Sequence, residues 1–426
     1  MRPPGARPQK MCYLLPAKGK SSMRRESRED QGTNLQVILM RRIASPVCKR
    51  FFASFFLLSP SWFGESPSAG RDPTASLAAS DTVTAEPAVS STERRSIEFL
   101  PLLSYDTDVG FGFGVKTFFL NQLGWHESFD LAAFHSTGGE RWYRFVAASP
   151  DFELRQGKPY PLSVELVIDY DKYLKNSFFG IGNKSRYEDR ERYTREPLEI
   201  SLSAGRGWTA ELKSYAALRY RQIRNFNFAD QSRLYHLPPS SNASTVRTGS
   251  IIVGGLYDRR DSYVNPSMGM VASVEAEFAS SGSLGSAGFT RVAAGLQGYS
   301  RPAGSRTTVA WRLNASMIDR EDLPVQLLLP LGGNQTLRGS PQDRFLDRVV
   351  VVANIEGRFP LVWRLGGIAG IDAGKVWHRL GALDLSRWSY NAVAGLRLYM
   401  NTFVVRLDVG VGLETTGLYL NFGQLF

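Results

Sequence analysis

An arginine in a long polar stretch is the residue of this sequence whose chemistry is easiest to specify. Arg338 stands between a leucine and a glycine in GGNQTLRGSPQDRF, residues 332–345. A guanidinium carries a rigid fork of five donors that fits carboxylates. Further along the chain, Glu356 and Asp372 each interrupt an apolar run. These residue types predict ion pairs. Whether the side chains can come into contact depends on the secondary-structure elements in which they lie.

Groups typical of catalysis or metal binding are missing from the sequence. We find no Ser/His/Asp set, no metal-ligand spacing and no phosphate-binding loop. Both cysteines, Cys12 and Cys48, lie near the N-terminus, which argues against a disulfide framework or a cysteine metal site. The histidines are scattered without ligand spacing: His126, His135, His236 and His378. The sequence therefore predicts no enzyme activity, no catalytic residue, no metal and no cofactor.

Net charge and hydropathy narrow the class of protein. The 426 residues carry a formal net charge of +11, but no basic stripe or RNA-binding motif accompanies it, so nucleic acid is not an expected partner. No apolar run reaches the roughly 20 residues that a membrane-spanning helix needs. A membrane barrel stays open, because barrel strands alternate in polarity and give a weak hydropathy signal.

The first 94 residues differ from the rest of the chain. Residues 1–64 read as an N-terminal extension that ends in a signal peptide, with basic residues before FFASFFLLSPSWFG (51–64). An amphipathic helix is the alternative; a lipoprotein is disfavoured because Cys48 precedes the apolar run. Residues 65–94, rich in Ser, Ala, Thr and Pro, read as a disordered linker. Both Met1 and Met40 are candidate starts.

From residue 95 to 426 the apolar period is two, which predicts an all-β domain. Turn residues bound each run, and no helical candidate appears. The runs predict about sixteen strands, a number that suits a transmembrane antiparallel β-barrel. They lie near residues 96–104, 110–121, 125–136, 141–151, 161–172, 196–206, 209–222, 246–257, 268–280, 287–299, 304–318, 347–358, 364–375, 388–399, 402–413 and 417–426.

The connections alternate in length. The longest, near 173–195, 223–245 and 319–346, all follow odd-numbered strands, whereas those after even-numbered strands are mostly tight. Short periplasmic turns and long outer loops are typical of outer-membrane barrels. We therefore expect an exported outer-membrane protein of a Gram-negative bacterium, with an organelle outer membrane as the alternative. A carboxylate facing lipid is costly, so Glu356 and Asp372 should face the lumen.

Aromatic residues and the last strand fit the same architecture. The last strand places Leu418, Leu420, Phe422 and Phe426 on one apolar face, which suits a lipid-facing strand that closes the barrel. Several aromatic residues fall near predicted strand ends, where interfacial girdles form: Phe118, Phe119, Trp125, Trp363, Trp377, Trp388 and Tyr399.

Four segments in order resemble the bacterial surface antigen superfamily, which includes BamA/TamA-type barrels and two-partner secretion pores. They are LYDRRDSYVNPSMGM (256–270), LGGNQTLRGSPQDRF (331–345), the pair NIEGRFPL (354–361) and GIDAGKVW (370–377), and the final YLNFGQLF. FFGIGNKS (178–185) also resembles short members of the group. The resemblance covers residues from about 98 to 426.

The resemblance implies roles for particular residues. It implies a periplasmic turn motif carried by Asp258, Arg260, Asp261, Pro266 and Gly269, and a closing-strand signal with Leu420, Phe422 and Phe426. It also implies a long outer loop that folds into the lumen, where Arg338 and Gly339 anchor it. We expect Arg338 to bridge Glu356 and Asp372.

Two departures from the family pattern bear on this loop. Ser340 stands where an aromatic residue usually follows Arg-Gly, which should weaken the packing of the loop tip, and Ile371 stands where an aromatic is common. We expect Asp343, Arg344 and Asp347 to form a charge cluster at the surface. Polypeptide-transport-associated domains usually precede such barrels, and only the linker and signal peptide are expected here.

These expectations support two functions. The first is outer-membrane protein assembly or polypeptide translocation through a lateral seam between residues 96–104 and 417–426, whose free strand edges can template an incoming strand. The second is a passive porin-like channel or a structural surface protein with a plugged lumen. Expected partners are outer-membrane lipid and, for the first function, client polypeptides or other assembly components. The barrel is expected to be monomeric.

Overall fold

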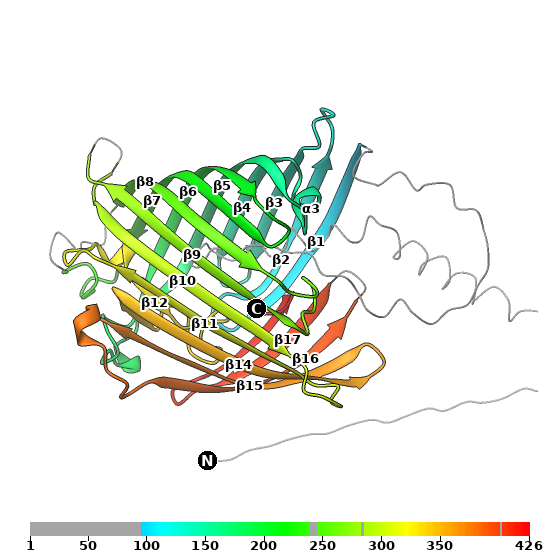
Figure 1. Ribbon diagram of the computed structural model, residues 1–426. Coiled ribbons are helices and arrows are strands. Elements are labelled where there is room, and N and C mark those ends of the chain that lie inside the picture. The colour runs from blue at the N-terminus through cyan, green and yellow to red at the C-terminus, as the bar shows by residue number, and fades with distance from the viewer. Residues whose placement is uncertain (1–94, 238–244, 283–284, 401–402) are drawn as a thin grey trace, which may run out of the picture. The chain divides into compact units, whose positions relative to one another are not determined.

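The alternating runs form a closed antiparallel β-barrel of 16 strands (Figure 1). This computed structural model describes residues 95–237, 245–282, 285–400 and 403–426. The expected extension and signal peptide (1–64) and linker (65–94) lie outside the described residues. The all-β barrel and its strand number, predicted from the period of two, are confirmed.

The barrel strands follow one another around the wall, and β18 closes against β1. Their bounds are β1 (Ser96–Asp106), β2 (Gly110–Leu120), β3 (Ser128–Ser136), β4 (Glu140–Ser149), β5 (Tyr160–Phe178), β6 (Glu191–Gly207), β7 (Leu212–Phe226), β8 (Thr245–Asp258), β9 (Gly269–Ser280), β10 (Phe289–Ser300), β11 (Thr308–Ile318), β14 (Val349–Val362), β15 (Leu365–Trp377), β16 (Ser389–Tyr399), β17 (Val404–Val411) and β18 (Thr416–Phe422).

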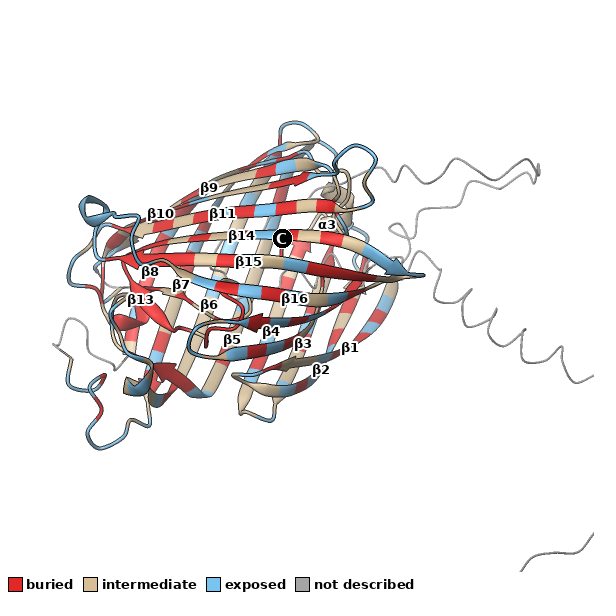
Figure 2. Ribbon diagram, turned by 90° about the horizontal axis from the view of Figure 1, so that it is seen from below, coloured by how far each residue is buried: buried red, intermediate tan, exposed pale blue. Residues whose placement is uncertain are grey.

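Each strand turns alternate side chains inward and outward, as the pleat requires. On β1 the even-numbered Leu100 and Leu102 are buried, whereas Phe99 and Leu103 are exposed on the outside. Figure 2 shows buried and exposed residues alternating along the strands. An outer surface rich in exposed apolar side chains and an inner surface rich in charge follow from this alternation.

The two ends of the barrel differ in their connections. We call the end where β1 begins and β18 finishes the terminal end, and the other the loop end. At the loop end lie the connections 179–190, 319–348 and 378–388, whereas 208–211 and 363–364 turn tightly at the terminal end. One connection is shorter than predicted from the sequence, because β5 and β6 continue to pair from Tyr173↔Arg195 to Phe178↔Glu191.

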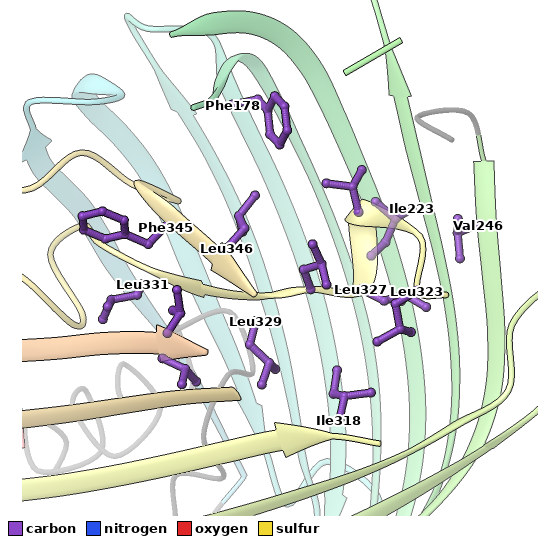
Figure 3. Packing of buried hydrophobic residues seen from close by; sticks show 14 of the residues in the cluster. Phe178, Ile223, Val246, Ile318, Leu323, Leu327, Leu329, Leu331, Phe345 and Leu346 are labelled. Carbon is purple, nitrogen blue, oxygen red and sulfur yellow. The ribbon is translucent and has the colours of Figure 1, made fainter. Parts of the chain in front are cut away.

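The longest connection, residues 319–348, enters the barrel and is called the inserted loop below. It carries the 3-10 turn η5 (Val325–Leu327) and a small hairpin, β12 (Leu329–Leu331) with β13 (Phe345–Asp347). Its apolar side chains pack against inward residues of β5, β7, β8, β14 and β15 (Figure 3). This hydrophobic cluster joins the inserted loop to opposite sides of the wall.

Helix is almost absent from the part of the chain that the structure describes. α3 (Phe152–Arg155), η3 (Tyr187–Asp189) and η6 (Leu380–Ala382) are single turns in connections. Among these residues, no helix has the length and apolar character to cross a membrane.

The predicted aromatic girdle is only partly correct. Trp125 and Trp363 are exposed near the terminal end, as expected. Phe118 and Trp377 are buried instead, because their positions in β2 and β15 turn their side chains inward. A position near a strand end is therefore not enough to predict that an aromatic side chain faces outward. Whether the residue is odd or even in the alternation along its strand decides which face it occupies.

Candidate functional site

Arg338 lies in the inserted loop and is completely buried, with 0% of its side chain exposed. Its Nε donates to Asp372 Oδ2 at 2.8 Å and its Nη2 to Asp372 Oδ1 at 2.8 Å. Its Nη1 donates to Glu356 Oε1 at 2.6 Å. The structure therefore brings together the three residues that the sequence paired, with Asp372 held in a bidentate geometry. Charge-assisted forks of this kind are among the strongest hydrogen bonds in proteins.

A third carboxylate, missed in the sequence analysis, completes the set. Asp408 on β17 accepts from Arg338 Nη1 at 3.0 Å. It also pairs with Arg397 on β16. The signal was available, because Asp408 interrupts an apolar strand in the same way as Glu356 and should have been assigned to the lumen by the same argument.

Two glycines let the inserted loop come this close to the wall. Gly339 has φ +102°, a conformation that side chains rarely adopt. A Cβ built on Gly410 of β17 would lie 2.2 Å from the carbonyl carbon of Arg338, and one on Gly339 would lie 2.6 Å from that of Gly410. The backbones of loop and wall thus meet directly.

Ser340 takes part in this contact, contrary to the expected weak packing. It is buried, and its Oγ accepts from Asn391 Nδ2 at 2.9 Å. The same amide donates to the Arg338 carbonyl at 3.0 Å. A small hydroxyl therefore packs by hydrogen bonding where an aromatic was expected. Ile371 faces outward and does not touch the loop.

The expected surface cluster of Asp343, Arg344 and Asp347 is wrong, because all three are buried. Arg344 donates to both carboxylate oxygens of Glu414, at 2.5 and 2.6 Å. Asp343 lies 3.4 Å from Arg195. These residues therefore bind the inserted loop to the barrel wall and are not solvated at the surface. The segment 178–185 (FFGIGNKS) also contacts the inserted loop, because Gly182 N donates to Leu346 O at 2.8 Å and Ser185 accepts from Arg344.

The turn motif lies at the terminal end, away from Arg338. Arg260 Nη2 donates to Asp258 Oδ2 at 2.8 Å, and Asp261 accepts from Ser267 N at 2.9 Å. Gly269 has φ +105°, and a Cβ there would lie 2.1 Å from Arg259 O. Pro266 is buried within the turn. These contacts hold the β8–β9 turn in one shape. Burial acts to lower the pKa of Arg260, but interactions with Tyr299 and Asp258 outweigh it and raise this pKa above its usual value.

The final residues depart from the predicted closing strand. Leu420 and Phe422 lie on the outward face of β18, but Phe426 is buried inside with Leu256, Val271, Tyr299 and Ala310. The chain turns inward at Gly423, which has φ +78°. Phe426 therefore does not belong to a lipid-facing row.

The seam between β1 and β18 is short. Tyr105↔Leu420 and Asp106↔Tyr419 are the pairs in register among the described residues of these strands. Thr107 Oγ1 adds two bonds, accepting from Leu418 N at 2.8 Å and donating to Leu418 O at 3.2 Å. By contrast β1 and β2 pair continuously from Ser96↔Leu120 to Asp106↔Gly110. One edge of β1, from residue 96 to 104, therefore has no registered strand partner in the part of the chain that the structure describes.

The inserted loop bonds to both sides of this seam. On the β18 side, Gly339 N donates to Tyr419 Oη at 3.0 Å, and Thr415 Oγ1 donates to Gly339 O at 2.5 Å. On the β1 side, Asn334 Nδ2 donates to Asp106 Oδ2 at 2.6 Å. Gln342 N donates to Asp108 Oδ2 at 2.7 Å. The loop therefore spans the seam from within the lumen.

Burial sets the electrostatics of two carboxyl groups that lie outside the barrel strands. Removal from water raises the pKa of the Asp108 carboxyl above its usual 3.8, although Gln342 N opposes this by donating to it. Burial likewise raises the pKa of Asp347. Within the described ranges, no three His, Cys, Asp or Glu side chains gather as a metal site.

Comparisons with known proteins bear on this geometry. A family model described as the Omp85 superfamily domain matches residues 124–426. A BamA structure from Haemophilus ducreyi, lacking POTRA domains 1–3, is similar with a TM-score of 0.57 and 15% identity, covering 78% of this chain and 70% of that one.

Two CdiB structures are also similar, each over 78% of this chain. CdiB from Acinetobacter baumannii has a TM-score of 0.50 and 14% identity over 66% of its length. CdiB from Escherichia coli has a TM-score of 0.50 and 16% identity over 68% of its length. No curated protein matches the sequence. At identities this low, the structural similarity shows a shared fold. The match to the family model confirms the resemblance seen in the sequence.

Proposed function

This chain belongs to the Omp85 superfamily, and from that premise we propose that it assembles outer-membrane proteins or translocates polypeptides through the seam between β1 and β18. The observation that carries the proposal is the short register of this seam. A strand edge without a partner presents unpaired N–H and C=O groups, and these can pair with an incoming strand. Residues 96–104 of β1 supply such an edge.

The inserted loop supports this function as a strap across the seam. Arg338, Glu356 and Asp372 fix the loop to β14 and β15, away from the seam. From that anchor the loop reaches both β18 and β1. In the proposed cycle, the strap limits how far the strands part, and the anchor returns them to register.

Membership of the superfamily also supports a location in the outer membrane and the partners expected there. The outward side chains of β1, such as Phe99, would contact outer-membrane lipid, which a barrel requires at its apolar belt. Client polypeptides or other assembly components would meet the seam. The proposed action is mechanical and includes no catalytic residue. The turn motif would shape the periplasmic side.

A reversible lock on the seam tests the proposal. Tyr105 and Leu420 are registered partners, so Tyr105→Cys/Leu420→Cys should form a disulfide between β1 and β18 in a Cys12→Ser/Cys48→Ser background. The measurement is insertion of an unfolded small barrel protein, diluted from urea, into liposomes that contain the locked protein. We expect oxidation to abolish the assistance and a reductant to restore it.

The matched control shares one cysteine with the lock. Leu407 and Leu420 are registered across β17 and β18, a pair that need not part. Leu407→Cys/Leu420→Cys should assist equally when oxidised and reduced. Undiminished assistance with the oxidised 105–420 lock would rule out the seam as the route.

A passive channel is the second candidate, and the opposite lumen wall favours it. There Arg144–Asp169 and Arg221–Glu199 pairs keep part of their side chains exposed to the lumen. A wet, charged wall suits solute passage. Steady conductance of the purified protein in a planar bilayer, unchanged by the seam lock and without assisted insertion, would select this function instead.

A further inference from the structure

Three side chains in one row of the lumen wall have hydrogen-bond donors that no acceptor among the described residues satisfies. Arg397 on β16, Arg406 on β17 and Asn421 on β18 are registered neighbours. Arg406 is 2% exposed, yet its Nε and Nη1 donate no hydrogen bond. Arg397 Nη2 and Asn421 Nδ2 donate none either. Buried donors without acceptors are rare, and each such site calls for a ligand or an explanation.

The side-chain carboxylates near this row are already engaged by arginines. Ion pairs join four arginines, Arg338, Arg358, Arg397 and Arg406, to three carboxylates, Glu356, Asp372 and Asp408, within the described residues. Arg338 pairs with all three carboxylates. Arg406 Nε is left 3.6 Å from Asp408, and Arg397 Nη2 is 3.8 Å from Glu356.

The chain's own final residues cover part of the row. Gln424 Oε1 accepts from Arg397 Nε at 2.9 Å, and Phe426 O accepts from Arg358 Nη2 at 2.8 Å. Each of these oxygens satisfies one N–H of a guanidinium. A carboxylate placed at the unmet donors would satisfy two N–H groups at once.

The position of the row indicates what would bring that carboxylate. Asn421 lies on β18 beside the seam, next to the edge of β1 that has no registered partner. We propose that Arg397, Arg406 and Asn421 form a carboxylate site for an extended polypeptide strand that enters at the seam, with an acidic side chain turned into the lumen. The proposal rests on the proposed function, because it requires a strand to reach β1. It specifies which strands the barrel prefers.

The first test supplies the carboxylate within the chain. Asn421→Asp places a carboxylate opposite Arg406, and we expect the midpoint of heat unfolding in detergent to rise by about 3 °C. In an Arg406→Gln background the gain should disappear. The control is Asn314→Asp, a buried lumen position whose registered neighbours are Gly295 and Val352; its midpoint should fall.

The second test supplies the strand in trans and leaves the protein unchanged. Two blocked peptides copy residues 415–423, one as in the chain and one with Asn421→Asp. Fluorescence anisotropy against the full-length protein in micelles should show about tenfold tighter binding of the acidic peptide, since a charge-assisted bond replaces an unmet donor. Arg406→Gln should reduce this preference to twofold or less, and 0.5 M salt should weaken it only slightly because the site is buried.

Each outcome bears on one claim. Equal binding of both peptides, together with no stabilisation by Asn421→Asp, overturns the carboxylate site while leaving the seam function to its own lock experiment. Displacement of the acidic peptide by low millimolar inorganic phosphate would assign the site to phosphate groups and overturn the polypeptide ligand. Stabilisation by Asn421→Asp with preferential peptide binding supports both the site and the strand that fills it.

Discussion

The two walls of the lumen use the same residue types in different ways. On the β14–β18 wall, the inserted loop brings Arg338 to Glu356, Asp372 and Asp408, and all four side chains are 0% exposed. On the opposite wall, the Arg221–Glu199 pair links β7 to β6 and its side chains remain 18% and 19% exposed. The first arrangement binds a separate segment to the wall. The second lines the wall and leaves it in contact with water.

Burial determines what each arrangement contributes. Partly exposed ion pairs are screened and typically contribute less than about 1 kcal/mol. Removing one partner of a fully buried group leaves an uncompensated charge and costs several times more. The comparison therefore predicts large effects under the inserted loop and small effects at partly exposed pairs such as Arg221–Glu199.

The largest expected effect is that of Arg338→Ala. It leaves three buried carboxylates without their shared partner, which should destabilise the seated loop by about 3–5 kcal/mol. Limited proteolysis of the folded barrel should then cut within residues 332–345, which the parent protein protects. Arg221→Ala is the matched change on the opposite wall and should leave the cleavage pattern unaltered. Equal protection in both variants would remove the distinction between the walls.

Gly410→Ala probes the backbone contact without changing charge. The added Cβ would lie 2.2 Å from the Arg338 carbonyl carbon, so loop or strand must shift. Overpacking of this kind costs about 1–3 kcal/mol. The midpoint of heat-induced unfolding on electrophoresis should fall. Gly381→Ala, where nothing lies within 4 Å, is the control and should have no effect.

Tyr419→Phe removes the acceptor that Gly339 N uses on β18. A buried N–H left unpaired costs about 1–3 kcal/mol, toward the lower end for one neutral bond. Accessibility of Thr415→Cys to a maleimide should rise modestly. The exposed Tyr390 offers the control, because Tyr390→Phe should not change labelling. A null result for Tyr419→Phe would show that the strap does not depend on this bond.

The smallest effect expected is that of pH on the β1 side of the strap. Burial raises the pKa of Asp108, so ionisation costs more in the folded than in the unfolded protein. The stability that this carboxyl contributes is present at a pH below its pKa in the unfolded protein. It is lost as the pH rises through the raised pKa of the folded protein. Asp108→Asn should therefore be slightly more stable than the parent at pH 7 and equal to it near pH 4. Heat-unfolding midpoints across this range check the sign.

Much of the barrel could be predicted from the sequence, because a period of two and turn residues are local signals. The prediction that Glu356 and Asp372 face the lumen followed from the free-energy cost of a charged side chain in lipid. The same reasoning could have found Asp408. The burial of Arg344 could not be foreseen, since it depends on Glu414 and Ser185, which are distant in sequence. The inward turn at Gly423 depends likewise on arginines of other strands.

The central claim is that Arg338 holds the strap, and the strap holds the seam. Hydrogen–deuterium exchange of the parent protein and Arg338→Ala in the same micelles tests it most directly. The account predicts faster exchange in the variant at residues 416–422 of β18 and at the β18-facing amides of β1, with β8 and β9 unchanged. Unaltered exchange at the seam, once proteolysis has shown that the loop is released, would contradict it.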